Sequence, residues 1–152
     1  MITIFMFSSQ NASVSGKLSE GITYKIACIT VKNFETFSFD KQKEIVEGMH
    51  FYIRKAAHFS EYAILGVLAF LNADAYLKKT RSKFLAVLPF CLLYASSDEF
   101  HQLFTDGRYG SPVDVMIDFS GSVTGMMLIY IFLLIMSKIR EKSKYSSVQN
   151  NI

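Results

Sequence analysis

The chain has 152 residues, of which 51% are hydrophobic, and its formal net charge is +3. This length suits one compact unit, and a mean hydropathy above zero argues against a soluble domain. The basic residues adjoin apolar stretches and lack interleaved aromatic residues, which excludes a nucleic-acid-binding patch. A soluble helical bundle is a weaker alternative, because residues 123–136 are apolar on almost every side of a helix.

The N-terminal part of the chain divides into a short apolar segment and a longer polar one. Residues 1–7 are apolar but too short to cross a bilayer, and they lack the features of a signal peptide. We expect them to be the end of a first membrane span whose beginning is missing. Residues 8–54 are expected to form an outer segment. Within it, an amphipathic helix from Asp40 is expected to lie along the membrane interface and then turn into the next span.

Three apolar stretches follow, at residues 56–77, 84–104 and 113–136. Because about 20 helical residues cross the hydrocarbon core, each stretch is long enough for a full transmembrane helix. The predicted fold is therefore an all-α integral membrane bundle. It comprises three full transmembrane helices, a truncated first span and an amphipathic interfacial helix, in one membrane domain over residues 1–137. Residues 138–152 are expected to form a polar, basic tail.

The basic residues predict how the chain is oriented in the membrane. Lysine and arginine crowd the loop at residues 78–83 and again the tail after residue 137. Positively charged loops stay on the cytoplasmic side, so both segments are predicted to be cytoplasmic. Two spans separate them, and the two assignments agree independently. The opposite ends of the three spans then lie at the outer face.

Ionisable residues gather at those outer ends. Each costs about 2.5–3.5 kcal/mol at the centre of a span, so a chain that carries several either buries them against one another or uses them. Asp114 and Asp118 share a helical face with Gly121 and Gly125. This GxxxG spacing lets a neighbouring helix approach closely, and the two carboxylates are therefore expected to point into the bundle.

We interpret these clusters as one functional site in which five acids face three bases. Partial burial disfavours such an excess of one charge. His58, Glu61 and Asp98 are the candidate catalytic acids or bases. The candidate ligand-binding residues are Arg54, Lys55, Glu99, Gln102, Arg108, Asp114 and Asp118. No metal site is expected, because two histidines with acids at no standard spacing are a weak zinc signal, and the cofactor, if any, is unknown.

Other interpretations of the same residues stay open. The cluster also fits a polar clasp that joins the three helices of a non-enzymatic scaffold or binding protein. A cation- or proton-linked carrier fits less well, because the inner halves of the last two spans hold no acids. The residues alone do not decide whether the protein is an enzyme.

At these positions the chain resembles the VanZ-like family of small bacterial membrane proteins. The matching segments are FSSQ at 7–10, RKAAHFSEY at 54–62, YASSDEFHQ at 94–102, GR at 107–108 and DVMIDFSG at 114–121 with Gly125. The resemblance covers roughly residues 1–136 and implies a multi-pass protein of the bacterial cell membrane. The member that gives the family its name is associated with reduced susceptibility to teicoplanin.

The resemblance implies a cell-envelope protein that binds or modifies a surface component and so lowers the action of glycopeptide antibiotics. Its partners would be the lipid bilayer and, at the site, an anionic lipid or a lipid-linked cell-wall precursor. Arg54, Lys55 and Arg108 are the residues expected to hold such an anionic group.

Overall fold

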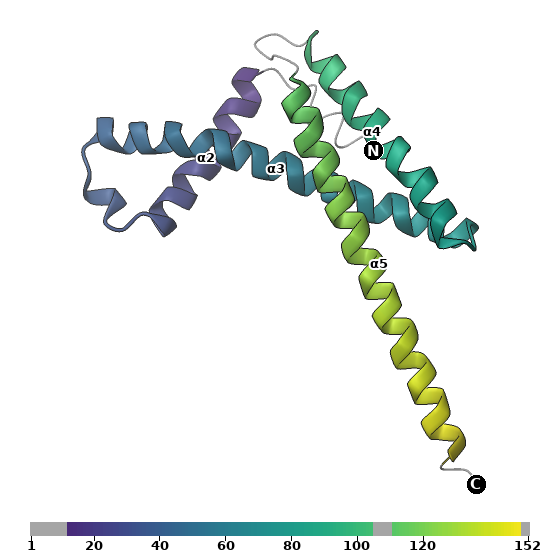
Figure 1. The fold of residues 1–152 in the computed structure, drawn as a ribbon. Helices are drawn as coiled ribbons and strands as arrows, with labels where there is room; N and C mark the ends of the chain where they lie inside the picture. The colour runs from purple at the N-terminus through teal and green to yellow at the C-terminus, as the bar shows by residue number, and fades with distance from the viewer. Residues whose placement is uncertain (1–11, 105–110, 150–152) are drawn as a thin grey trace.

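The computed structural model describes residues 12–104 and 111–149, with side chains at 20–104 and 111–143. Its elements are α2 (Ala12–Thr30), η1 (Phe34–Thr36), α3 (Phe39–Tyr76), α4 (Thr80–Gln102) and α5 (Pro112–Gln149). Every regular element within the described ranges is helical, so the predicted all-α class is confirmed. Figure 1 shows that α5 crosses α3 near its middle, that α4 runs from the end of α3 back toward the start of α5, and that α2 lies against the first half of α3.

The first half of α3 packs against α2 around a small apolar core. Ala27, Phe34 and Val46 are buried there, and the ring of Tyr24 meets that of Phe34 edge-on at 5.4 Å between centroids. The connection between the two helices turns at Asn33, whose φ is +58°. Asparagine tolerates this left-handed conformation better than most residues. Helix α2 thus supplies 19 helical residues to the segment at 8–54, in addition to the helix expected from Asp40.

Helix α3 runs without a break for 38 residues, or about 57 Å at 1.5 Å per residue. The sequence predicts a separate interfacial helix that turns into the span near residue 55, and this prediction is wrong. The helix begins at Phe39, one residue before Asp40, and contains no proline to interrupt its hydrogen bonds. Because nothing breaks the ladder, the amphipathic segment and the apolar segment form one straight element.

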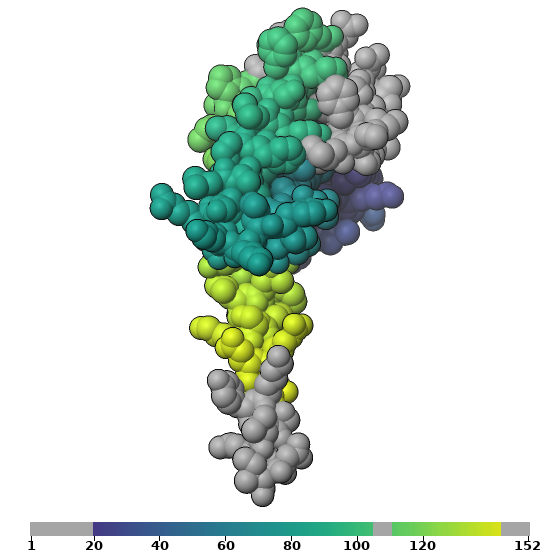
Figure 2. All heavy atoms as spheres, turned by 90° about the vertical axis from the view of Figure 1, so that its right-hand side faces the viewer, coloured from purple at the N-terminus to yellow at the C-terminus, as the bar shows by residue number. Residues whose placement is uncertain are grey.

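Two helices of the described ranges, α3 and α5, are long and apolar enough to cross a membrane. Helix α4 has 23 residues and continues through Pro89, but it carries charged residues near both ends. Its membrane crossing therefore remains a prediction. Helix α5 continues through the predicted tail to Gln149, and its C-terminal part extends away from the other helices in both views (Figures 1 and 2).

The backbones of α3 and α5 lie in close contact where the two helices cross. A Cβ atom added to Gly125 would overlap the carbonyl oxygen of Ala63, and one added to Gly121 would overlap that of Phe59. From the other helix, a Cβ at Gly66 would overlap the carbonyl oxygen of Ser122. The predicted GxxxG contact is present, and Gly66 completes it. Backbones this close exclude any side chain from the crossing.

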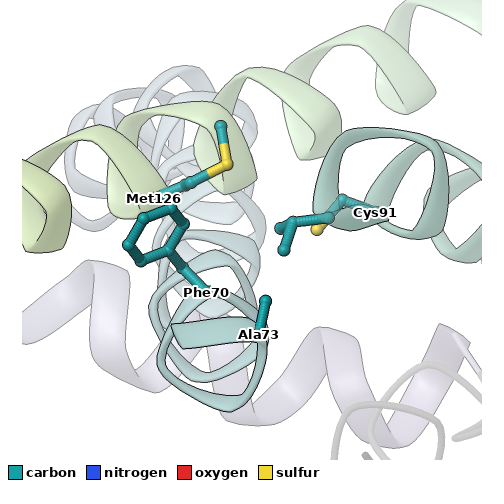
Figure 3. Close-up of a cluster of buried hydrophobic side chains, with 5 residues drawn as sticks. Phe70, Ala73, Cys91 and Met126 are labelled. Atoms are coloured by element: carbon teal, nitrogen blue, oxygen red, sulfur yellow. The ribbon is translucent and has the colours of Figure 1, made fainter. Parts of the chain in front are cut away.

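Beyond the crossing, α4 joins α3 and α5 through an apolar core. Phe70 and Ala73 of α3, Cys91 of α4 and Met126 of α5 are all buried in it (Figure 3). The rings of Phe70, Phe84 and Tyr130 also meet edge-on, with centroids 5.3 to 5.8 Å apart. This core fixes one end of the three-helix bundle, and the polar residues lie at the other end.

We expect Gly125→Ala to lower the free energy of unfolding in detergent by about 1–3 kcal/mol, because its methyl group overlaps a backbone atom that has no rotamer to change. The matched control is Gly48→Ala on α3, where an added Cβ meets nothing within 4 Å. That substitution is expected to be neutral or to stabilise the helix by about 0.5–1 kcal/mol. Equal unfolding midpoints for the two variants would contradict the close crossing.

Candidate functional site

Seven of the ten predicted site residues lie around one small cavity where α3, α4 and α5 meet. They are Arg54, Lys55 and His58 of α3, Glu99 and Gln102 of α4, and Asp114 and Asp118 of α5. The cavity has a volume of about 10 Å³. A single water molecule needs about 10–15 Å³ measured in this way. The three sequence segments thus converge, and the space between them suits one water molecule or one small ligand group.

An ion pair between Lys55 and Asp114 joins α3 to the first turn of α5. Lys55 Nζ donates to Asp114 Oδ1, and the two side chains are 24% and 22% exposed. The ammonium group also lies 5.3 Å from the ring centroid of Phe51, within the range of a cation–π contact. Lys55 is therefore already occupied by partners from its own chain.

The Glu99 carboxylate fixes the start of α5. Glu99 Oε1 accepts a hydrogen bond from Gln102 Nε2 at 2.8 Å, and Oε2 accepts one from the Ser111 backbone N–H at 2.9 Å. Ser111 Oγ in turn accepts the Val113 N–H at 3.2 Å, as a helix-capping side chain does. Ser111 was not among the predicted site residues, although a serine directly before Pro112 is a recognisable helix-start signal.

Three polar side chains of the same region are buried and unsatisfied. Asp98 is 2% exposed, and neither of its carboxylate oxygens has a hydrogen-bond partner among the described residues. Asp118 is 1% exposed; one oxygen lies 4.0 Å from His58 Nδ1, and the other has no partner in the described part of the chain. The buried Tyr62 hydroxyl lies near Asp98 without forming a well-aligned hydrogen bond.

These unsatisfied groups are the chemically available part of the site. A buried polar group without a partner costs about 1–3 kcal/mol, and a charged one costs more. The charges of Glu99, Asp98 and Asp114 all act on Asp118 repulsively, and only Lys55 among its main neighbours opposes them. The region is therefore able to accept a proton, a hydrogen-bond donor or a cationic group, which would lower this repulsion.

Of the other three predicted residues, Asp98 is the buried carboxylate described above, and it does not line the small cavity. Glu61 lines an apolar groove between α3 and α4 rather than the small cavity. Arg108 lies outside the described residues. Tyr62 belongs to the predicted segment at 54–62 but was not among the predicted site residues. It follows His58 by four positions, so the helical period places it on the same face. In the described ranges, no group of three or more His, Cys, Asp or Glu residues is placed to hold a metal ion.

We expect Lys55→Ala to lower the free energy of unfolding by about 1–3 kcal/mol, because it leaves the half-buried Asp114 carboxylate without its partner. The control is Lys41→Ala on the same helix, which removes an exposed pair with Glu44 and should cost less than about 0.5 kcal/mol. A double-mutant cycle of Lys55→Ala with Asp114→Ala should show coupling. Additive losses in the cycle would argue against the ion pair.

Comparison with known proteins identifies the family. The VanZ/LLP1 family model matches the chain over residues 1–134. No curated protein and no solved structure matches it. The matched range includes all ten predicted site residues, the whole of α3 and the part of α5 up to residue 134. Because the match covers most of its length, the chain belongs to the VanZ/LLP1 family.

Proposed function

We propose that this protein lowers the susceptibility of a bacterial cell to glycopeptide antibiotics such as teicoplanin by acting on a component of the cell envelope. Family membership supports this association with glycopeptide resistance. The observation that carries the proposed role of the site is the Asp98 carboxylate, which is buried with neither oxygen hydrogen-bonded in the described part of the chain. An ionisable group in this position is costly to keep, and it is a functional-site candidate by default.

The proposed topology places this site at the outer face of the membrane, with the loop at 78–83 and the tail in the cytoplasm. The contacts between α3 and α5 support it. Lys55 pairs with Asp114, and a Cβ on Gly125 would meet Ala63, so residue numbers rise together along both helices. Two helices that run in the same sense require the chain to return between them, and α4 is the element that lies between them.

The proposed ligand is the polar group of a lipid or of a lipid-linked cell-wall precursor. Lys55 is paired with Asp114, but Arg54 lines the cavity and has no ion pair in the described ranges. An arginine in this position is suited to hold a carboxylate or phosphate group. Because the cavity holds about one water molecule, such a group would bind at its rim, and only a proton or a water molecule would enter.

In the enzymatic form of this proposal, Asp98 and His58 act as general acid and general base and transfer a proton to or from the bound group. A second candidate is a binding or scaffold protein without chemistry. The observation that favours it is that several polar residues of the cluster are engaged in contacts between the helices, namely the Lys55–Asp114 pair and the Glu99–Ser111 hydrogen bond. In the enzymatic proposal Asp98 is needed for chemistry, whereas in the binding or scaffold proposal it has no chemical role.

The test is the teicoplanin susceptibility of a sensitive bacterial host that expresses the chain, Asp98→Asn or Glu47→Gln at equal membrane abundance. We expect the wild type and Glu47→Gln, whose carboxylate is exposed, to raise the inhibitory concentration. Asp98→Asn should abolish the increase, because loss of a general acid or base lowers a rate by about 10²–10⁴-fold.

Two results would contradict the proposal in different ways. If the wild type leaves the inhibitory concentration unchanged, the proposed role in glycopeptide susceptibility is wrong. If Asp98→Asn protects the host as well as the wild type does, that role stands, but Asp98 is not required for it.

A further inference from the structure

A large apolar groove lies between α3 and α4, separate from the small polar cavity. Its volume is about 860 Å³, and it is lined by one face of α3 from Glu61 to Tyr76, by Leu77 directly after it, and by residues 86–90 of α4. Glu61 and Asn72 are polar, and nearly all of the other lining residues are apolar. Ligand sites typically have volumes of about 300–1,000 Å³, so the groove has the size of a binding site.

Helix α4 contacts α3 through two aromatic pairs beside the groove. The rings of Tyr62 and Tyr94 lie 6.1 Å apart near its Glu61 end, and those of Phe70 and Phe84 lie 5.5 Å apart about halfway along its α3 side. The lining includes small side chains, among them Ala69 and Ala86. Small side chains fill less of the space between two helices than large ones do.

The groove leads to the polar cluster along both helices. On α3, His58 of the cavity precedes Glu61 by three residues, and Glu61 precedes Leu65 by four, so the three share a face. On α4, Phe90 of the groove, Tyr94 and Asp98 follow at four-residue spacing, and the first two rings lie 6.2 Å apart. One end of the groove thus reaches the layer that contains the unsatisfied Asp98 carboxylate.

We propose that this groove binds one acyl chain of a membrane lipid, with the lipid's polar headgroup beside Glu61 and the polar cluster. The groove follows α3 for the fifteen residues between Glu61 and Tyr76, or about 22 Å. One leaflet of the roughly 30 Å hydrocarbon core is about 15 Å deep, so a single chain fits along it. The inference deepens the proposed function, on which it rests for the identity of the ligand as a lipid.

A molecule with an apolar chain and a polar headgroup accounts for both the apolar groove and the polar cluster next to it. Its chain would fill a groove whose lining is apolar and which lies on a helix long enough to cross a membrane. Its headgroup would bring hydrogen-bond donors toward the layer where Asp98 and one oxygen of Asp118 lack hydrogen-bond partners in the described residues. An apolar helix from a second copy of the chain would fill the groove but would leave these carboxylates unsatisfied.

The test compares tryptophan placed inside and outside the groove. Ala86 and Ala75 are both exposed alanines, but only Ala86 lines the groove, so Ala86→Trp fills it and Ala75→Trp does not. The full chain and both variants are purified from bacterial membranes in detergent, and native mass spectrometry measures bound lipid and oligomeric state. We expect one bound phospholipid per protein molecule in the wild type and in Ala75→Trp, and no bound phospholipid in Ala86→Trp.

Several outcomes would overturn the inference. They are a wild type without bound lipid, equal lipid retention by the two variants, a polyprenyl-linked lipid in place of a phospholipid, or a dimer that Ala86→Trp dissociates. This readout needs no antibiotic phenotype. Lipid loss in Ala86→Trp without any effect of the wild type on teicoplanin susceptibility would keep the acyl-chain site and remove the proposed function.

Discussion

The close approach of α3 and α5 is the contact on which the rest of the structure depends. At Gly66, Gly121 and Gly125 the backbone of one helix lies directly against that of the other. Such a contact has little freedom to slide, because the carbonyl oxygens of each helix fit only where the other lacks a Cβ. The crossing therefore sets the register that places Asp114 beside Lys55 and Asp118 beside His58.

The polar cluster contains residues that join the helices through ion pairs or hydrogen bonds, and residues whose carboxylate oxygens lack such partners among the described residues. Lys55 with Asp114, and Glu99 with Ser111, satisfy one another across helices and act as a clasp. Asp98 and Asp118 are buried more deeply than these partners, yet they keep carboxylate oxygens without a hydrogen bond in the described part of the chain. Natural proteins tolerate such destabilising groups mainly where function requires them. We therefore propose that both interpretations of the sequence apply, to different members of one cluster.

Much of this arrangement is readable from the sequence. The apolar stretches indicate helices, and the spacing of Gly121 and Gly125 predicts both the close crossing and the inward face of Asp118. Gly66 is harder to find, because no second glycine stands one turn away on α3 to complete a motif. The turn predicted near residue 55 is absent, since a change from polar to apolar composition does not break a helix that lacks proline.

The individual partners in the cluster depend on register and helix rotation, which the sequence does not contain. Helical spacing places His58 and Glu61 near one another, but one residue corresponds to a rotation of about 100°. That rotation puts Tyr62 in the buried cluster and Glu61 in the groove. Likewise, the pairing of Lys55 with Asp114 follows from the crossing rather than from any local pattern.

The central claim is that Asp98 is kept for function and not for the fold. The most direct test compares the free energies of unfolding of Asp98→Asn and Glu99→Gln in detergent with that of the wild type. The structure predicts that Asp98→Asn unfolds at the same or a higher midpoint, because it removes a buried charge that has no partner in the described chain. Glu99→Gln should lower it, because Glu99 accepts two hydrogen bonds that an amide cannot both accept with equal strength. A loss of stability in Asp98→Asn as large as that in Glu99→Gln would contradict the claim and make the whole cluster a structural clasp.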